Sequence, residues 1–331
     1  MILALETSCD DTCAAVVSAE GEIRSNVISS QGIHDRYGGV VPEIASRHHL
    51  DLIGAAVADA LARADISLTE IDLIGVTHGP GLVAALLVGV ATAKALAAVN
   101  ATALAPVDHL HGHVAAGFLK PSPFEPPFLS LIASGGHTLL AQVKDHGPGF
   151  EVIGQTVDDA AGEAFDKGAR LLGLGYPGGA ALERLARDGD PEAFDFPTGK
   201  RMPGLDFSFA GLKTSLLYRI RDLGETESER RRADLAASYQ RAIVESLTIR
   251  VKRALAHTGS DRLAVGGGVA ANGPLRDRLA TLGVELDVPP RELCTDNAAM
   301  IASAARFVQP IAYPGYLDLE VYATGERAVA A

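Results

Sequence analysis

A histidine pair with helical spacing is the sharpest chemical signal in this sequence. His109 and His113 are four residues apart in the run HLHGH, so on a helix both imidazoles share one face and can reach one metal ion. His111 is two residues from each and points elsewhere. Spacing alone leaves open the alternative that all three are surface histidines at the start of a helix. The zinc-protease motif needs glutamate directly after the first histidine, and Leu110 stands there, which disfavours a thermolysin-type protease.

Two polar turns carry residues suited to phosphate chemistry. Thr7–Thr12 contains the adjacent carboxylates Asp10 and Asp11, which beside a phosphate require a cation or a proton-transfer role. An ordinary Asx turn explains the same residues. In Ser134–Thr138, glycines allow backbone N–H groups to approach an anion, although a tight hairpin has the same composition.

Two further segments near the C-terminus have the same ambiguity. Gly266–Asn272 is rich in glycine and precedes a predicted helix, whose N-terminus favours anions, but it is not the dinucleotide-binding GxGxxG motif. Asp296 precedes the last predicted helix, where it is either the N-cap or a third metal ligand.

The elements that position these residues occur twice along the chain. Each half has a strand–turn–strand hairpin, at Ile2–Ala19 and Phe128–Lys144, and later a strand that runs through a glycine loop into a helix. Such duplication indicates two related lobes with a cleft between them. The proline-rich run Pro121–Pro127 is the natural linker. We therefore expect one lobe of residues 1–122 and 293–331 and another of residues 123–292.

Composition excludes several classes of protein. The chain has 331 residues, 47% of them hydrophobic, and three cysteines that we expect to be reduced in a cytoplasm. No export signal is visible, and the apolar run Gly81–Val99 is interrupted by a lysine, so we expect a buried helix there and no membrane segment. The net charge of −12 argues against a general nucleic-acid binder. Lys200–Arg253 nevertheless has 12 basic against 7 acidic residues, either two solvated helices or a footprint for a phosphate backbone.

Eight segments, in order along nearly the whole chain, match one known family. They are Ile2–Thr12, Gly38–His49, Thr77–Gly89, Ser134–Thr138, Phe165–Gly179, Phe207–Thr214, Gly266–Asn272 and Cys294–Met300. Together they resemble the tRNA N6-adenosine threonylcarbamoyltransferases, a family formerly described as O-sialoglycoprotein endopeptidases.

The resemblance implies an α/β fold of two duplicated lobes, the actin-like ATPase fold of actin, hexokinase and Hsp70. It implies an acyltransferase that moves the threonylcarbamoyl group from threonylcarbamoyl-AMP to N6 of adenosine 37, just 3′ of the anticodon, in tRNAs reading codons that begin with A. The products are t6A and AMP. The expected partners are tRNA, an inactive paralogue subunit and a P-loop ATPase.

The resemblance also assigns roles to residues of this chain. His109, His113 and Asp296 match the family's metal ligands, for one divalent ion per subunit, iron or alternatively zinc. The positions expected to contact the adenylate are Ile132, Ala133, Ser134, Gly135, Gly136, Asp166, Gly179, Glu183, Asn272 and Asp296. Asp10 is our candidate for the base that accepts the N6 proton. The family usually has Glu at the position of His111 and often Asp at that of Glu183, which puts the tuning of the metal and the ribose contact in doubt.

Three rival functions remain to be weighed. A metalloprotease requires a general base beside the metal, which the HLHGH run lacks. A small-molecule kinase of the same fold binds Mg²⁺ through carboxylates and not through a histidine pair. A non-catalytic scaffold is expected to lose the three metal ligands, which this sequence retains.

Overall fold

The computed structural model describes residues 1–37, 39–175 and 177–323. Gly38 and Tyr176, which belong to two of the matched segments, and residues 324–331 lie outside the described residues. The chain forms two compact units. Unit 1 contains Met1–Pro126, Asp145–Phe150 and Asp296–Ala331, and unit 2 contains Pro127–Lys144 and Glu151–Thr295. The lobe boundaries expected from the sequence stay a prediction.

Unit 1 is built on a five-stranded sheet with the order β3-β2-β1-β4-β5. Its strands are β1 (Ile2–Glu6), β2 (Asp11–Val17), β3 (Ile23–Ser30), β4 (Leu73–Gly79) and β5 (Ala103–Asp108). The first three form an antiparallel meander, whereas β4 and β5 run parallel to β1. Every residue of β1 is buried, because helices cover both faces of the sheet.

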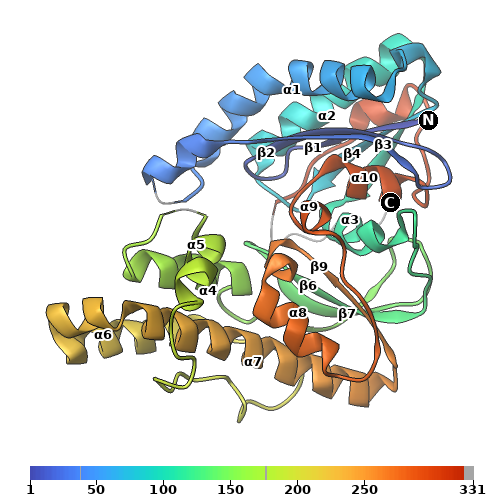
Figure 1. Ribbon diagram of the computed structural model, residues 1–331. Coiled ribbons are helices and arrows are strands. Elements are labelled where there is room, and N and C mark those ends of the chain that lie inside the picture. Colours follow the sequence, from blue (N-terminus) through green and yellow to red (C-terminus); the bar gives the residue numbers. More distant parts are fainter. Residues whose placement is uncertain (38, 176, 324–331) are drawn as a thin grey trace. The chain divides into compact units, whose positions relative to one another are not determined.

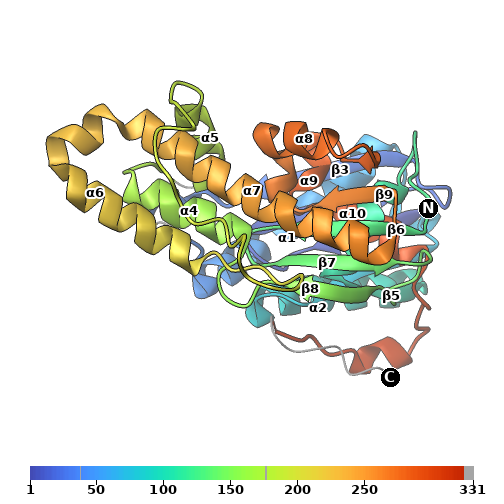
Figure 2. The ribbon, with the colours of Figure 1, turned by 90° about the horizontal axis from the view of Figure 1, so that it is seen from below.

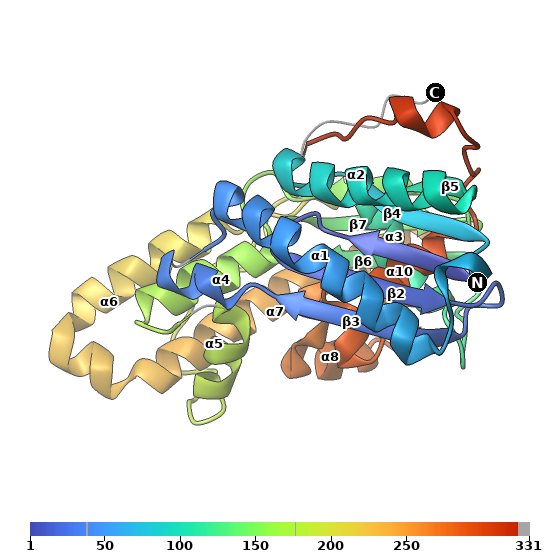
Figure 3. The same cartoon turned by 90° about the horizontal axis from the view of Figure 1, so that it is seen from above.

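Four helices of unit 1 cover that sheet. They are α1 (Pro42–Ala64), α2 (Val83–Asn100), α3 (His109–Ala115) and α10 (Ala298–Ala305). Figure 1 shows α1 and α2 on one face of the sheet and α3 and α10 on the other. Figure 3, seen from above, shows α1 and α2 side by side across the first face. One described helix, α2, is long and apolar enough to cross a membrane, yet it packs on β4 and α1, and 39% of its residues are buried.

Unit 2 repeats this sheet with the order β8-β7-β6-β9-β10. Its strands are β6 (Phe128–Ala133), β7 (Thr138–Val143), β8 (Glu151–Gln155), β9 (Arg262–Gly266) and β10 (Glu285–Asp287). Its helices are α4 (Ala161–Leu171), α5 (Gly178–Ala186), α6 (Ala210–Arg230), α7 (Arg232–Thr258), α8 (Gly273–Ala280) and α9 (Arg291–Cys294). Figure 2 shows α6 and α7 as a long helical hairpin.

The two sheets have the same topology strand for strand. An antiparallel meander is followed by two strands parallel to its first member in each unit: β1–β2–β3 with β4 and β5, and β6–β7–β8 with β9 and β10. This confirms the duplicated α/β architecture expected from the sequence. The sequence patterns did not predict β5, β8 or β10, which are short or lack a regular alternation of buried and exposed residues.

A carboxyl group in the edge strand β10 gives a prediction about stability. One oxygen of Asp287, Oδ2, is buried without a hydrogen-bond partner among the described residues. Burial and the neighbouring Glu285 raise the pKa of Asp287 to about 6. The folded state therefore holds this proton more tightly than the unfolded chain, so the stability from Asp287 is present at low pH and is lost as pH rises from about 4 to about 6.

Asp287→Asn is accordingly expected to raise the melting temperature at pH 7.5 by about 2–4 °C, corresponding to about 1 kcal/mol after allowance for partial exposure. The gain should vanish at pH 4, where Asp287 is protonated. Thermal melts at the two pH values measure this. Asp277→Asn is the control, because Asp277 is exposed on α8 and takes no part in raising the pKa of Asp287, and it should give no gain. Equal melting temperatures of wild type and Asp287→Asn at pH 7.5 would contradict the prediction.

Candidate metal centre

The helix that carries the histidine pair begins directly where β5 ends. Asp108, the last residue of β5, is the N-cap of α3, and its Oδ1 accepts hydrogen bonds from the backbone N–H groups of Leu110 at 2.8 Å and His111 at 3.1 Å. The Tyr322 hydroxyl donates a hydrogen bond to the other oxygen of Asp108. The start of this short helix is therefore fixed from two sides.

Both histidines of the pair are buried and face each other. The ring centroids of His109 and His113 lie 4.7 Å apart at an interplanar angle of 79°. They are 5% and 3% exposed, which is unusual for imidazoles unless they have polar partners. The alternative of surface histidines at a helix start is therefore wrong.

Asp296 joins this pair from the far end of the chain. Its Oδ1 lies 3.6 Å from His109 Nε2 and 3.3 Å from His113 Nε2. One ligand atom from each of the three residues lies within 4.8 Å of the other two. The N-cap of α10 is Asn297, whose Oδ1 accepts from the Met300 N–H at 3.0 Å. The carboxylate of Asp296 is thus not used as the N-cap and can serve the cluster.

A glycine allows α10 to approach α3 closely enough to bring Asp296 to the pair. A Cβ at Gly112 would lie 2.7 Å from Ile301 Cδ1 and 3.3 Å from Met300 Cγ, closer than packed carbon atoms tolerate. The Ser303 hydroxyl also donates to the Ala115 carbonyl oxygen at 2.7 Å, which ties the two helices together. Any larger residue at position 112 must therefore displace the side chains of Ile301 and Met300, which pack α10 against α3.

The donor set fits a divalent metal ion. Neither ring nitrogen of His113 has a hydrogen-bond partner among the described residues, although both are buried. Such orphaned nitrogens are costly unless a ligand satisfies them. Ligand bonds of about 2.1 Å at tetrahedral angles require donor atoms about 3.4 Å apart, close to the separations from Asp296 Oδ1. Two imidazoles and one carboxylate suit iron or zinc.

The charges around the pair also favour a cation. Burial by itself lowers the pKa of His109, but the carboxylates of Asp296 and Glu6 outweigh it and raise this pKa to about 9. The pocket therefore stabilises positive charge at the imidazole, and a metal ion supplies the same compensation.

His111, which stands where the family usually has Glu, turns away from the cluster. It is fully buried, and its Nε2–H donates to the His146 carbonyl oxygen at 2.9 Å. Burial lowers the pKa of His111, so the ring is neutral. The side chain anchors the β7–β8 turn, Asp145–Phe150, within unit 1.

The turn after β1 places Asp10 and Asp11 in different settings. Burial, above all, raises the pKa of Asp10, and nearby Asp296 adds to that rise. Burial raises the pKa of Asp11, the first residue of β2, to about 7. The turn is held by His49, whose Nε2–H donates to the Cys9 carbonyl oxygen at 2.9 Å. Neither aspartate belongs to the metal cluster.

In unit 2, the predicted adenylate-binding positions gather around the ends of β6 and β9. Ile132 and Ala133 are buried in β6, and a Cβ at Gly267 would lie 2.4 Å from the Ala133 carbonyl oxygen. In the turn that follows, Ser134 Oγ accepts from the His137 N–H at 3.1 Å. The turn glycines are exposed, and a Cβ on either would meet open space.

Two acidic residues of α4 and α5 lie on hydrogen-bond networks of unit 2. Asp166 Oδ1 accepts from the Gly178 N–H at 2.8 Å, one residue before Gly179. Glu183 Oε2 accepts from Asn272 Nδ2 at 3.1 Å. Asn272 Nδ2 also donates to Gln240 at 2.9 Å.

The remaining polar atom of Asn272 is occupied as well. Its Oδ1 caps α8 by accepting from the Leu275 N–H at 3.0 Å. With both amide hydrogens donated and the carbonyl oxygen engaged, the Asn272 side chain holds Glu183 in place. That these residues bind the adenylate stays a prediction.

Comparison with known proteins decides the family. The sequence profile of the tRNA N6-adenosine threonylcarbamoyltransferases, called TsaD, matches residues 22–303. The chain belongs to this family. A tRNA N6-adenosine threonylcarbamoyltransferase of Clostridium botulinum strain 657 is 49% identical over 312 residues, covering 92% of both chains. One of Symbiobacterium thermophilum is 48% identical over 324 residues, covering 96% of this chain and 94% of the relative. As a member of the family, the chain is an acyltransferase.

Solved structures of lower sequence similarity show the same fold. HypF of T. kodakarensis superimposes with a TM-score of 0.60 at 14% identity, covering 92% of this chain and 47% of HypF. Component A of the Acidaminococcus fermentans (R)-2-hydroxyglutaryl-CoA dehydratase gives a TM-score of 0.54 at 14% identity, covering 92% of this chain and 95% of that protein. At these identities the likeness establishes only the actin-like α/β fold.

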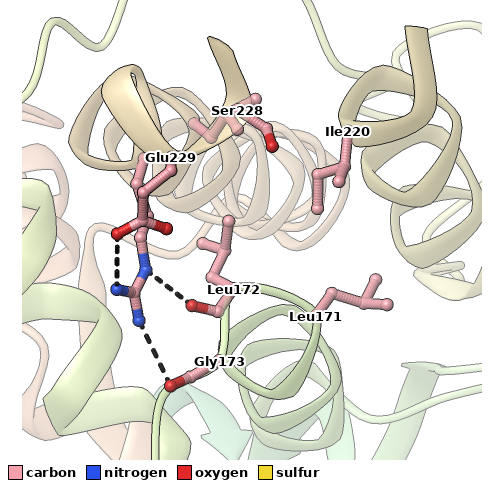
Figure 4. A pocket seen from close by; sticks show the side chains of 8 residues that line it. Leu171, Leu172, Gly173, Ile220, Ser228 and Glu229 are labelled. Atoms are coloured by element: carbon pink, nitrogen blue, oxygen red, sulfur yellow. Dashed lines mark hydrogen bonds and ion pairs between the residues drawn. The ribbon is translucent and has the colours of Figure 1, made fainter. Parts of the chain in front are cut away.

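A cavity in unit 2 involves none of the family's matched site positions. About 360 Å³ in volume, it lies among α4, α6 and α7 (Figure 4). Arg232 at its edge donates to the carbonyl oxygens of Leu172 at 2.6 Å and Gly173 at 3.2 Å. The neighbouring Arg231 pairs with Asp234 and stacks on the Phe194 ring. Arg232 therefore ties α7 to the end of α4, and Arg231 packs against Phe194, within unit 2.

Sequence reasoning missed three residues that build the metal centre. Asp108 precedes the first histidine, where an N-cap signal was available. Gly112 lies inside the HLHGH run, and a glycine within a helix is a recognised sign of close packing. Tyr322 gave no signal, because only the fold brings it to Asp108.

Proposed function

We propose that this protein transfers the threonylcarbamoyl group from threonylcarbamoyl-AMP to N6 of adenosine 37 in tRNAs that read codons beginning with A, with iron held by His109, His113 and Asp296. Membership of the family supports the reaction. The observation that carries the metal dependence is the buried cluster of two imidazoles and one carboxylate. Zinc is the alternative ion, and the reaction belongs in the cytoplasm, where tRNA is available.

The reaction is an acyl transfer that needs positioning more than a covalent intermediate. The N6 lone pair attacks the carbamoyl carbon, the bond from that carbon to the phosphate oxygen breaks, and AMP leaves with the electron pair. An ion at the cluster supplies Lewis-acid polarisation and a fixed point for the substrate. Asp10 accepts the proton that N6 loses. AMP is already a good leaving group, so orientation supplies much of the rate.

Residues of unit 2 bind the adenylate in this proposal. The exposed glycine turn Ser134–Gly136 offers backbone N–H groups to the phosphate. Asp166 and Glu183 orient the nucleoside, and Glu183 contacts the ribose from a position fixed by Asn272. Glutamate is one methylene longer than the family's usual aspartate. The hydrogen bond from Asn272 therefore sets how far the Glu183 carboxylate extends toward the ribose.

The basic helices of unit 2 contribute to tRNA binding through their exposed residues. Lys213 and Arg221 on α6 are exposed and form no ion pair with any described residue. Each is available to a backbone phosphate, unlike Arg231 and Arg232. A chain with a net charge of −12 captures a polyanion poorly by itself, so partner subunits supply the remaining positive surface.

The surface of α1 and α2 supports the expected inactive paralogue as a partner. On α2 the exposed residues that recur at helical spacing include Ala84, Leu87, Ala91, Ala95 and Ala98. On α1 a similar row of exposed residues, Leu50, Gly54, Ala58 and Ala62, lies beside exposed charged residues such as Arg47 and Asp51. Two adjacent helices with exposed stripes of small apolar residues allow another pair of helices to pack closely, which a solvated surface does not require. The P-loop ATPase completes the proposed assembly.

Ala91→Arg is expected to weaken binding of the paralogue at least about 10-fold, because it places a long charged side chain in the middle of an apolar interface. The melting temperature should stay unchanged, since Ala91 is exposed. The matched control is Ala256→Arg, an exposed helical alanine of unit 2. Titration calorimetry with the purified paralogue measures both. Equal binding by the two variants would show that the paralogue docks elsewhere.

One experiment tests the whole proposal. The iron-loaded protein, the paralogue and the P-loop ATPase are incubated with threonylcarbamoyl-AMP and unmodified tRNA, and the digested nucleosides are analysed by mass spectrometry. We expect t6A and one AMP for each t6A. A tRNA with guanosine at position 37 is the control and should give none. Absence of t6A with the complete set of partners would overturn the proposal, and peptide cleavage by the loaded protein would favour the protease alternative.

A further inference from the structure

A buried carboxylate contacts the first histidine of the metal centre at Nδ1, the ring nitrogen that does not face the cluster. Glu6, the last residue of β1, is 1% exposed, and its only ion-pair partner among the described residues is His109, with Oε2 at 2.9 Å from Nδ1. No lysine or arginine of the described chain compensates it. Burying a glutamate without a lysine or arginine partner costs free energy of folding. The contacts that offset this cost therefore indicate the role of Glu6.

Among the described residues, Glu6 has three hydrogen-bond partners, and each of them donates to it. The Thr77 hydroxyl on the neighbouring strand β4 donates to Oε2 at 2.6 Å, and the Ser8 N–H donates to Oε1. An ionised carboxylate only accepts, so His109 Nδ1 must carry the proton that it shares with Glu6. The other ring nitrogen, Nε2, is the one that faces the cluster, 3.6 Å from Asp296 Oδ1, and is the nitrogen left for a metal ion.

We propose that Glu6 is a positioning residue, which fixes His109 in the Nδ1-protonated tautomer and holds its Nε2 toward the metal. The inference rests on the proposed metal site. A carboxylate behind a ligating histidine orients the ring and makes the ligating nitrogen more basic. Buried Glu6 and partly exposed Asp296 also bring two negative charges to the histidine pair, and a divalent cation neutralises them.

The second histidine of the pair lacks such a support. Nδ1 of His113 has no hydrogen-bond partner among the described residues. The site is therefore asymmetric: His109 is fixed from behind by Glu6, whereas His113 is oriented only by packing on α3 and by Asp296. Loss of Glu6 should therefore weaken metal binding strongly, although Glu6 is not itself a metal ligand.

The proposal is tested with Zn²⁺ as the probe, because zinc needs no control of redox state. The affinity is measured by competition with a chromophoric chelator. Glu6→Gln keeps the size of the side chain but removes its charge, and its amide cannot accept from all three donors at once. We expect the dissociation constant for Zn²⁺ to rise about 10–100-fold.

Thr77→Val is the matched control. It removes another hydrogen bond to the same carboxylate oxygen but leaves the bond from Glu6 to His109 in place. We expect its dissociation constant for Zn²⁺ to change less than about 3-fold. If Glu6→Gln binds Zn²⁺ as tightly as Thr77→Val does, Glu6 has no positioning role. If the wild-type protein binds no Zn²⁺, the metal site itself fails, which is a separate outcome.

A measurement on the wild-type protein makes the test independent of how Glu6→Gln folds. In the zinc-loaded protein, long-range ¹H–¹⁵N spectra of the imidazole rings identify which nitrogen of His109 is protonated. We expect a proton on Nδ1 that is protected from exchange with water. A proton on Nε2 instead would overturn the proposal whatever the affinities are.

Discussion

Replacing His113 with alanine is expected to lower the metal content from about one ion per chain to nearly none. Two ligands then remain, His109 from α3 and Asp296 from the segment before α10, and neither holds the ion alone. Turnover of threonylcarbamoyl-AMP and tRNA should fall by at least about 100-fold, because the Lewis acid and the fixed point of the substrate are both lost. Elemental analysis of the purified protein measures the ion and also distinguishes iron from zinc.

His111→Ala is the matched control for that substitution. This histidine lies on the same short helix and is equally buried, but it binds the His146 carbonyl oxygen and not the cluster. Its loss should destabilise the fold by about 1–3 kcal/mol, since it removes a buried ring and the hydrogen bond to the partly buried His146 carbonyl group, while the ion is retained. A full complement of metal in His113→Ala would exclude His113 as a ligand.

The spacing of the histidine pair was enough to predict a helix face, because the period of a helix is local information. The sequence equally predicted the duplicated hairpins and the glycine turns. It could not choose between N-cap and ligand for Asp296. That choice depends on Asn297 taking the cap and on Gly112 letting α10 approach α3, and both are tertiary facts.

Charge patterning was the weaker guide. A count of basic residues in Lys200–Arg253 treats every arginine alike, yet Arg231 and Arg232 are used in packing and only exposed residues such as Lys213 are available to a phosphate. Glu6 shows the same limit. It lies in the matched segment Ile2–Thr12, but its position behind His109 depends on how β1 and α3 meet.

The second large effect is expected at Asp10. Asp10→Asn should lower kcat about 10²–10⁴-fold with the metal content unchanged, because the substitution keeps the shape of the turn and removes the only function proposed for this side chain, accepting the N6 proton. The pKa of Asp10 is raised by burial, which makes the carboxylate a stronger base than an exposed aspartate. In the wild type, kcat should therefore fall as pH drops through this pKa, because the protonated acid cannot accept a proton. Asp10→Asn should lose that limb of the pH profile.

The neighbouring Asp11 is both the control and the rival. Its pKa of about 7 would also suit a general base. It is, however, the first residue of β2, where it pairs with Ser30 of β3, whereas Asp10 lies in the turn itself. Asp11→Asn should therefore retain most of the turnover and the acid limb. If turnover is instead lost in Asp11→Asn and stays near normal in Asp10→Asn, Asp11 is the residue that accepts the proton. The turn that contains Asp10 then serves only to hold Asp11 in place.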